Sequence, residues 1–332
     1  MTEQTRERLF GIAHALDHPV TRWVLIGTGS LLVIAPVLLL ALSPTLKPDH
    51  KRELWLRYRS WLILVPLMIG PILLGAAATI TAVCILSLLC YREFARATGL
   101  FRHSLTSAVV VLGILAVTFA VADHWYALFL ALPPLFIVLV AAANILQDQP
   151  KGYIQRVGLG ALAFMLFGAG LGHLGYFAND PLYRPILLML IATVELNDIF
   201  AFCCGKLFGK RKLAPNTSPN KTLGGSIGSV LLTTPLVALL AHSIFPGTNL
   251  DQPLPLTLLG LTVSIGGQLG DLMLSSVKRD IGVKDLGVTI PGHGGLLDRF
   301  DSLLLVAPAA FHLVGNFKGI GLEEPTRIIT GP

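Results

Sequence analysis

The sequence predicts an all-α, polytopic integral membrane protein with about nine or ten transmembrane helices. Its 332 residues are 53% hydrophobic and only 13% charged, whereas a soluble domain carries about 25% charged residues. The mean hydropathy of the chain is +0.71. The apolar residues also occur in runs of about 20, the length that a helix needs to cross a bilayer. The chain is therefore assigned to the polytopic membrane class.

The expected spans follow from the apolar runs. The first is expected at about 23–42. Residues 61–91 are too long for one span, and Gly70, Pro71 and Gly75 favour a pair of helices that meet near Gly75. The remaining spans are expected at about 105–122, 126–146, 157–176, 182–203, 225–245, 255–275 and 302–318.

The basic residues predict the orientation of these spans. They concentrate in segments 47–59, 92–102, 206–221 and 278–299, which fall on one side if there are ten spans. The positive-inside rule makes that side cytoplasmic, so both termini face outward. Arg6, Arg8 and Arg22 then lie outside, against the rule, unless the first span lies in the interface. The net charge of +6 is explained by loops beside anionic lipid, and no nucleic-acid partner is expected.

The segment 275–301 carries the most concentrated polar chemistry. It holds basic residues that suit phosphates, carboxylates that suit a metal ion, and a flexible glycine turn, all at a membrane edge. Within the helix expected at 255–279, Gln268, Asp271, Ser275 and Lys278 follow spacings of three, four and three and share one face. A functional site and a purely structural Asp271–Lys278 ion pair are both compatible with that face.

Asp298 and Asp301 are three residues apart at the start of the last span. With Asp271 they form a candidate all-oxygen site for Mg²⁺. The alternative is that both carboxylates only complement the positive end of a helix. Gly294 and Gly295 favour the functional interpretation, because two glycines allow a phosphate to approach the backbone closely.

The loop 205–222 follows a span that carries Glu195 and Asp198 on one face. Lys210 and its basic neighbours fit plain positive-inside topology, whereas Lys221 is less typical of such a signal. The loop is not a P-loop, because the glycine spacing is one residue short. The glycines from Gly224 onward are not a dinucleotide fingerprint, because no strand is expected before them.

The segment 275–301 resembles the signature of the phosphatidate cytidylyltransferases, the CDP-diacylglycerol synthases. The matching positions are Ser275, Lys278, Arg279, Lys284, Asp285, Gly287, Pro291, His293, Gly294, Gly295, Asp298, Arg299 and Asp301. Segments 91–96, 205–222 and 270–272 are also similar to the family. The resemblance covers about 57–318, so residues 57–332 are expected to form the membrane-embedded domain. Residues 1–56 then carry one extra transmembrane or interfacial helix.

The resemblance implies transfer of CMP from CTP to phosphatidic acid, with release of pyrophosphate. It implies Mg²⁺ on Asp271, Asp298 and Asp301, and allows for a second cation, monovalent or divalent. The implied catalytic residues are Ser275, Lys278, Arg279, Asp285, His293 and Arg299. The implied substrate or phosphate contacts are Asp198, Ser218, Lys221, Lys284, Gly294 and Gly295. It also implies a location in the bilayer of a bacterial inner membrane with cytoplasmic active-site loops, and a homodimer.

Two positions depart from the family pattern. Phe202 lacks a hydroxyl that the family usually has, and Gly224 lacks a polar side chain. These departures keep open a related membrane nucleotidyltransferase that acts on a different lipid phosphate. An ion-coupled transporter with Asp271 and Glu195 as ion sites and an inactive paralogue are the remaining alternatives. The loop rich in Gly, Lys, Arg and Asp disfavours the transporter, and the complete set of carboxylates disfavours the paralogue.

Overall fold

The computed structural model describes residues 3–42, 44, 47–287, 289–290, 294–319 and 327–331. Within these ranges it contains ten helical spans that are long and apolar enough to cross a membrane. The predicted all-α polytopic class is therefore confirmed. Pro291 and His293 of the predicted signature lie outside the described residues.

Eight of the spans are single helices, and two are interrupted. The single helices are α2 (Pro19–Leu42), α3 (Pro48–Leu74), α4 (Ala76–Thr98), α5 (Ser104–Ala122), α6 (Tyr126–Ile145), α9 (Tyr183–Phe208), α10 (Leu223–Ile244) and α11 (Pro253–Asp280). The sixth span joins α7 (Tyr153–Ala163), a π-helical segment (Phe164–Gly170) and α8 (Leu171–Phe177). The last joins α12 (Leu297–Phe300) and α13 (Leu303–Phe317). A short helix α1 (Glu3–Phe10) precedes them, and a 3-10 turn (Leu100–Arg102) follows α4.

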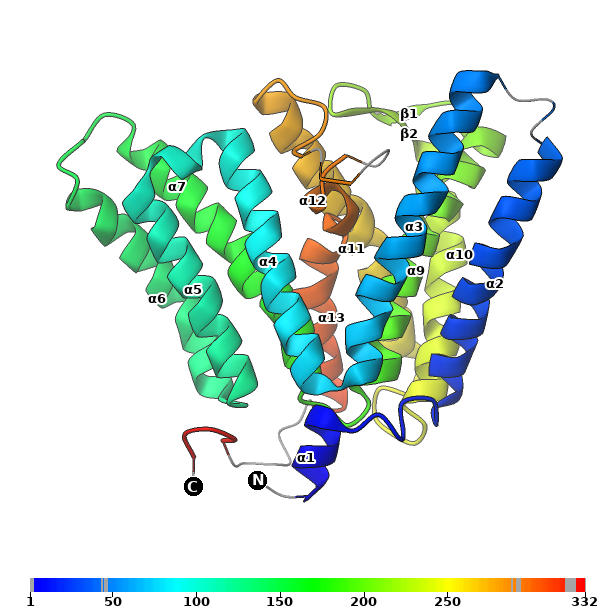
Figure 1. Cartoon of the computed structure of the whole chain (residues 1–332), viewed down its shortest axis with the longest axis horizontal. Coiled ribbons are helices and arrows are strands. Elements are labelled where there is room, and N and C mark those ends of the chain that lie inside the picture. The colour runs from blue at the N-terminus through cyan, green and yellow to red at the C-terminus, as the bar shows by residue number, and fades with distance from the viewer. Residues whose placement is uncertain are drawn as a thin grey trace.

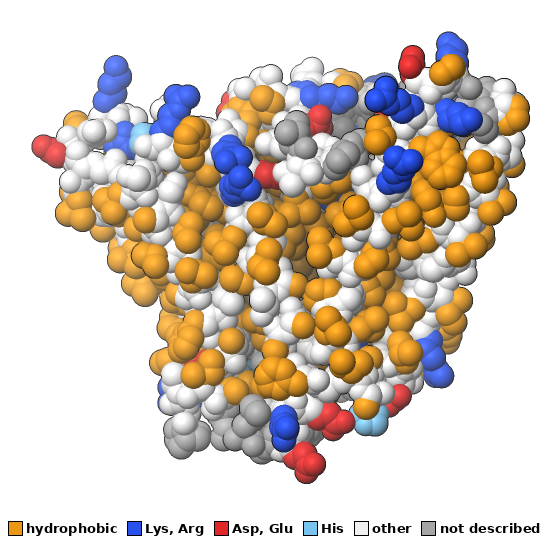
Figure 2. Space-filling model, viewed as in Figure 1, with side chains coloured by type: hydrophobic (Ala, Val, Ile, Leu, Met, Phe, Trp, Pro, Cys, Tyr) orange, Lys and Arg blue, Asp and Glu red, His pale blue; other side chains and the backbone are white. Residues whose placement is uncertain are grey.

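Successive spans run in alternating directions, so the connections divide between two faces (Figure 1). The α2–α3 connection, the end of α4, the segment between α9 and α10, and the end of α11 share one face, called here the basic face. Lys and Arg side chains gather on it in Figure 2. Both termini lie at the opposite face. The predicted distribution of the four basic segments and the termini between two faces is thus what the structure shows.

The pair α3–α4 meets at Gly75, as the sequence predicts. The backbone of Gly75 has φ 133°, a conformation that residues with a side chain rarely adopt. A Cβ at this position would also lie 2.4 Å from the carbonyl oxygen of Leu9. From this turn α3 and α4 diverge toward the basic face (Figure 1), and α1 packs beneath it.

The sequence did not predict a hairpin on the basic face. Strands β1 (Lys212–Ala214) and β2 (Ser218–Thr222) pair antiparallel, with Lys212 opposite Thr222 and Ala214 opposite Ser218. The expectation that no strand precedes Gly224 is therefore wrong. The residues of β2 are mostly polar and lack the alternating apolar pattern that usually signals a strand. Because β2 pairs only with β1 in this two-stranded sheet, it does not build the βαβ unit of a dinucleotide site.

Interhelical hydrogen bonds fix α9, α10 and α11 relative to one another. Asn197 of α9 donates to the carbonyl oxygen of Ser264 at 3.1 Å and accepts from Thr233 at 3.0 Å. Gln268 of α11 donates to Ser229 at 3.0 Å. Polar groups buried among apolar helices are costly unless they are hydrogen-bonded, so these bonds specify one packing register. That register places the inner face of α11 toward α9 and the hairpin.

The C-terminal residues 327–331 dock on the turn between α5 and α6. The buried carboxylate of Asp123 accepts from the amides of Ile329 at 2.5 Å and Thr330 at 2.9 Å, and from the Thr330 hydroxyl. Burial alone raises the pKa of Asp123, but these hydrogen bonds outweigh it and hold the pKa below its ordinary value. A carboxyl with a lowered pKa stabilises the docked state while it is ionised. Docking should therefore be lost as the pH falls through that lowered value.

Replacing Asp123 by Ala should release this tail at neutral pH. A hydrogen bond to a charged group contributes about 1.5–3 kcal/mol, so trypsin should cleave after Arg327 at least about tenfold faster. The release of peptide 328–332, followed by mass spectrometry, measures this rate. Asp49→Ala, an exposed carboxylate on the basic face, is the control. Equal cleavage rates in the two variants would contradict the docking role of Asp123.

Candidate functional site

Charged side chains from β2, α9, α11 and α12 gather at the basic face. The local fold puts each in place. The Thr222 side chain accepts from the amide of Gly225 at 3.1 Å and so caps α10. This cap ends β2 and directs Lys221, the residue before it, toward α11. On α11 the predicted polar face is the inward one, since Gln268, Ser275 and Lys278 are buried.

Lys221 and Asp271 form the first part of the cluster. The Lys221 ammonium lies 2.5 Å from the Asp271 carboxylate, and both side chains are about four-fifths buried. Ser275, one turn further along α11, donates to the other oxygen of Asp271 at 3.1 Å. The Asp271–Lys278 ion pair considered from the sequence is not formed. Helical spacing put the two residues on one face, but β2 supplies Asp271 with a closer cation.

Lys278 pairs instead with Asp298, at 2.8 Å between Nζ and Oδ1. The second oxygen of Asp298 accepts from the amides of Leu286 and Gly295, both at 3.1 Å. Asp298 is 6% exposed, so this carboxylate is removed from water and fully engaged. It ties α11, the loop after α11 and the first turn of α12 together. The interpretation of Asp298 as mere compensation of a helix end is therefore too weak.

Glu93 is a site residue that the sequence analysis missed. It is buried on α4, and its carboxylate accepts from the amides of Leu296 at 3.0 Å and Leu297 at 2.8 Å and from the Thr289 hydroxyl. Gly295 allows this approach, because a Cβ there would lie 2.6 Å from a Glu93 oxygen. A lone acidic residue in an apolar helix was the available signal. Glu93 thus fixes to α4 the loop that Asp298 fixes to α11.

Further carboxylates surround this core. Asp301 is buried and lies within electrostatic range of Asp271, Asp198 and Lys278. Asp198 on α9 also lies within range of Lys221 and Asp271. Arg299 is exposed, and its positive charge lies within electrostatic range of Asp198 and Glu195 of α9. The arrangement alternates positive and negative groups, as a site for a polyanion with a cation would require.

The donor set suits Mg²⁺ in its chemistry. Asp198, Asp271 and Asp301 offer only oxygen ligands, and they lie close enough to act on one another's charge, so a cation among them would relieve their repulsion. Within the described residues, however, no three such side chains converge into a ready metal-binding group. Lys221 and Lys278 neutralise Asp271 and Asp298 instead. The metal role of Asp271, Asp298 and Asp301 stays a prediction.

The other predicted residues lie around the rim of the cluster. Arg279 is exposed and donates to the carbonyl oxygen of Thr217 at 3.3 Å, linking α11 to the hairpin turn. Lys284 and Asp285 are exposed on the loop after α11, and a Cβ at Gly294 would lie 3.3 Å from the Asp285 carboxylate. Ser218 is half-buried at the start of β2. In the described part of the chain, no hydrogen bond ties the Lys284 or Ser218 side chain to the carboxylates.

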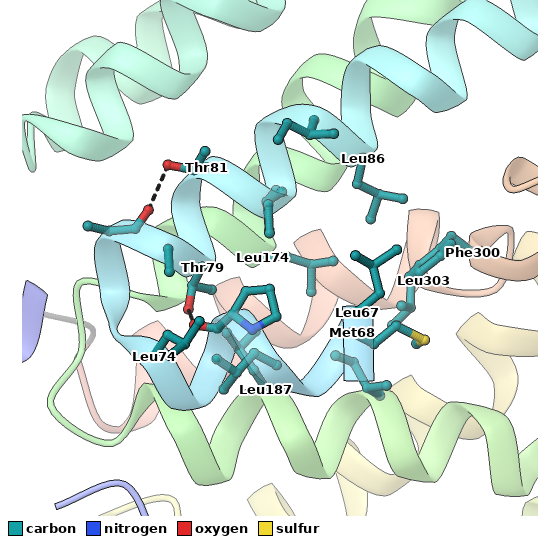
Figure 3. Close-up of a pocket in the computed structure, with 18 of the residues that line it drawn as sticks. Leu67, Met68, Leu74, Thr79, Thr81, Leu86, Leu174, Leu187, Phe300 and Leu303 are labelled. Atoms are coloured by element: carbon teal, nitrogen blue, oxygen red, sulfur yellow. Dashed lines mark hydrogen bonds between the residues drawn. The ribbon is translucent and has the colours of Figure 1, made fainter. Parts of the chain in front are cut away.

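An apolar cavity of about 650 Å³ opens beside the cluster. It lies between α3 and α4, where Figure 2 shows the surface hollowed. Leu296 and Phe300, which flank Asp298, line this cavity. Phe300 lies beside Leu303 at one side of it, and Leu174 and Leu187 also line it (Figure 3). Among the described residues that line the cavity, none is charged. A charged site and a hydrocarbon-lined space therefore adjoin each other at the level of α12.

Of the two positions that depart from the family pattern, Gly224 has the clearer structural cause. A Cβ at Gly224 would lie 2.7 Å from the carbonyl oxygen of Phe208, so the end of α9 leaves no room for a side chain. Phe202 lies one turn beyond Asp198 on α9, and the Lys206 ammonium lies 4.5 Å from its ring centroid. It belongs to the rim, outside the carboxylate core.

Comparison with known proteins gives one family. The sequence model of the cytidylyltransferase family matches residues 55–317. The uncharacterized protein YnbB of Escherichia coli (strain K12) is 33% identical over 276 residues, which cover 80% of this chain and 89% of that protein. The phosphatidate cytidylyltransferase of Staphylococcus haemolyticus (strain JCSC1435) is 40% identical over 175 residues, 51% of this chain and 65% of that enzyme. That of Rickettsia bellii (strain RML369-C) is 31% identical over 209 residues, 61% of this chain and 88% of that enzyme.

Proposed function

This chain belongs to the cytidylyltransferase family and is a membrane nucleotidyltransferase, and we propose that it transfers CMP from CTP to phosphatidic acid. A phosphate oxygen of the lipid attacks the α-phosphorus of CTP. The bond from that phosphorus to the bridging oxygen breaks, and pyrophosphate leaves with the electron pair. The products are CDP-diacylglycerol and pyrophosphate.

The observation that carries this proposal is the junction between the charged cluster and the apolar cavity. The substrate has a doubly anionic phosphate on a hydrocarbon body, and the site offers Lys221 and Lys278 beside a cavity without charged lining. Leu296 and Phe300, on either side of Asp298, line the cavity itself. A lipid phosphate is the class of molecule whose two ends match these two environments.

The residues of this chain supply positioning and charge. The second pKa of a phosphate monoester is about 6, so near pH 7 the lipid phosphate is largely ionised and needs no strong general base. The obstacle is repulsion between two anions. Lys221, Lys278, Arg279 and Arg299 lower that repulsion, and Ser275 can hydrogen-bond to a phosphate oxygen. Gly294 and Gly295 allow close approach of the backbone.

Mg²⁺ is part of the proposal. When bound, it would neutralise charge on the triphosphate and on the leaving pyrophosphate. Asp271 and Asp301 would hold it, with Asp198 as a neighbouring carboxylate. Asp298, whose oxygens already accept from Lys278 and two amides, contributes by holding the loop. We also propose that the basic face is cytoplasmic, in a bacterial inner membrane, where CTP reaches it from water.

The test is pyrophosphate release by the purified protein in detergent–lipid micelles. Release should require CTP, Mg²⁺ and phosphatidic acid together, and should fall below detection in Asp301→Ala. Size-exclusion chromatography of the variant shows whether it is folded. Folded wild-type protein that is inactive with phosphatidic acid but active with a polyprenyl phosphate would overturn the assigned lipid. Substrate uptake into vesicles without pyrophosphate release would overturn the enzyme mechanism.

A further inference from the structure

The apolar cavity has a definite length. It is lined along α4 from Ala77 to Leu89, which is roughly 18 Å at 1.5 Å per residue. One leaflet of hydrocarbon is about 15 Å thick, half of a bilayer core. The cavity therefore extends from the charged cluster as far as an ordinary acyl chain reaches from its headgroup.

The chemistry of the lining selects hydrocarbon. Two hydroxyls are present, and both are already bonded to the backbone: Thr79 to the carbonyls of Gly75 at 2.9 Å and Pro71 at 3.2 Å, and Thr81 to that of Ala77 at 2.8 Å (Figure 3). Neither hydroxyl therefore needs a ligand as its hydrogen-bond acceptor. The rest of the described lining is apolar, so a polar ligand would lose its hydration without compensation.

Helix α1 closes the end of the cavity that is far from the charged cluster. Leu9 and Phe10 line that end together with Leu74. Leu9 is buried, and its carbonyl oxygen lies against Gly75 so closely that no Cβ would fit between them. Arg184 of α9 donates to the carbonyl oxygens of Gly11 and, at 3.4 Å, of Ile72. This closed end of the cavity, called here the floor, is thus anchored to both α3 and α9.

We propose that α1 is the floor of an acyl-chain site and sets the upper length of chain that the enzyme accepts. This inference rests on the proposed function, because the occupant is one acyl chain of the lipid substrate whose phosphate lies among Lys221, Lys278 and Arg299. The floor comes from residues before position 55, where the match to the family begins. It therefore lies outside the part of the chain that the family model matches.

Two variants change the available length of the cavity in opposite directions. Ala82 lines the cavity about midway along it, so Ala82→Phe shortens the available space to roughly 10 Å, the rise from Ala82 to Leu89. The double variant Leu9→Ala, Phe10→Ala removes the side chains of the floor. Ala108→Phe, on an exposed position of α5, and Ile12→Ala, exposed just after α1, are matched controls outside the lining.

The experiment measures kcat/KM with CTP and phosphatidic acids whose acyl chains have about 8, 16 and 24 carbons, at fixed surface concentration. Ala82→Phe should keep its rate with the shortest lipid within about threefold and lose at least tenfold with 16 carbons. The Leu9, Phe10 double variant should raise the ratio of 24-carbon to 16-carbon rates by at least about fivefold. Both controls should keep the wild-type profile.

The outcomes distinguish a failure of the acyl-chain floor from a failure of the proposed function. Wild-type activity with unchanged chain-length profiles in both variants would overturn the floor and leave the cytidylyltransferase intact. Wild-type protein that releases no pyrophosphate with any phosphatidic acid would overturn the proposed function and the inference together. Activity of Ala82→Phe on the shortest lipid shows that the variant is folded, so a loss with longer chains reports the cavity alone.

Discussion

Replacement of Asp298 by Asn is expected to lower kcat by a factor of about a hundred to several thousand. Asp298 holds Lys278 at 2.8 Å and two loop amides at 3.1 Å. Removing one partner of a buried ion pair costs about 3–5 kcal/mol, and each 1.36 kcal/mol lost from transition-state stabilisation is about a tenfold change in rate. An amide group carries no charge and can accept with only one of its two polar atoms.

The matched control for Asp298→Asn is Asp280→Asn, at the exposed end of α11. Pyrophosphate release and size-exclusion profiles are compared for both. If Asp298 acts through Lys278, the double variant with Lys278→Met should be no slower than the slower single variant, because coupled residues are not additive. Full activity of Asp298→Asn would remove this residue from the catalytic machinery.

The sequence was sufficient to predict the number of spans and their approximate places, because a helix that crosses a bilayer must be long and apolar whatever its neighbours. It did not predict that α3 and α4 extend beyond the apolar run at 61–91, to Pro48 and Thr98. Gly75 as the point where α3 and α4 meet also followed from local chemistry. The inward face of α11 followed from spacing, since residues three and four apart share a helix face. These features depend on residues close together in the chain.

The ion-pair partner of each charged side chain could not be predicted in the same way. Asp271 and Lys278 are seven residues apart on one helix, yet each pairs with a group brought by another element, Lys221 and Asp298. The cavity could not be predicted either, because its wall is assembled from residues of α1, α3, α4, α8, α9, α12 and α13. Helical periodicity shows which side of a helix is apolar, and leaves open whether that side meets another helix, the bilayer or a cavity.

Glu93 shows how such long-range partners organise the site. It lies about 200 residues before the loop that it binds, in a segment that the sequence analysis noted only for its resemblance to the family. The loop between α11 and α12 carries Gly294 and Gly295 as well as the exposed Lys284 and Asp285. With Asp298 and Lys278 on one side and Glu93 on the other, this loop is fixed to both α11 and α4.

Replacement of Glu93 by Gln is therefore expected to lower kcat about 10- to 100-fold. Among the described residues, the groups that hydrogen-bond to the Glu93 carboxylate, two amides and the Thr289 hydroxyl, all donate to it. In Gln one acceptor becomes an NH₂ group that faces a donor, and a hydrogen bond to a charged acceptor is worth about 1.5–3 kcal/mol. Because Glu93 positions the loop and does not line the acyl cavity, KM for the lipid should change less than about threefold.

Hydrogen exchange distinguishes this positioning role from general destabilisation. Amides of residues 294–297 should exchange faster in Glu93→Gln while those of α9 and α10 stay protected. Gly295→Ala should reproduce the kinetic change, because its Cβ would lie 2.6 Å from a Glu93 oxygen and 2.9 Å from the Gly287 amide nitrogen. Glu53→Gln, an exposed carboxylate paired with Arg57 on α3, is the matched control. Unchanged kcat and loop exchange in Glu93→Gln would show that Asp298 alone suffices to hold the loop.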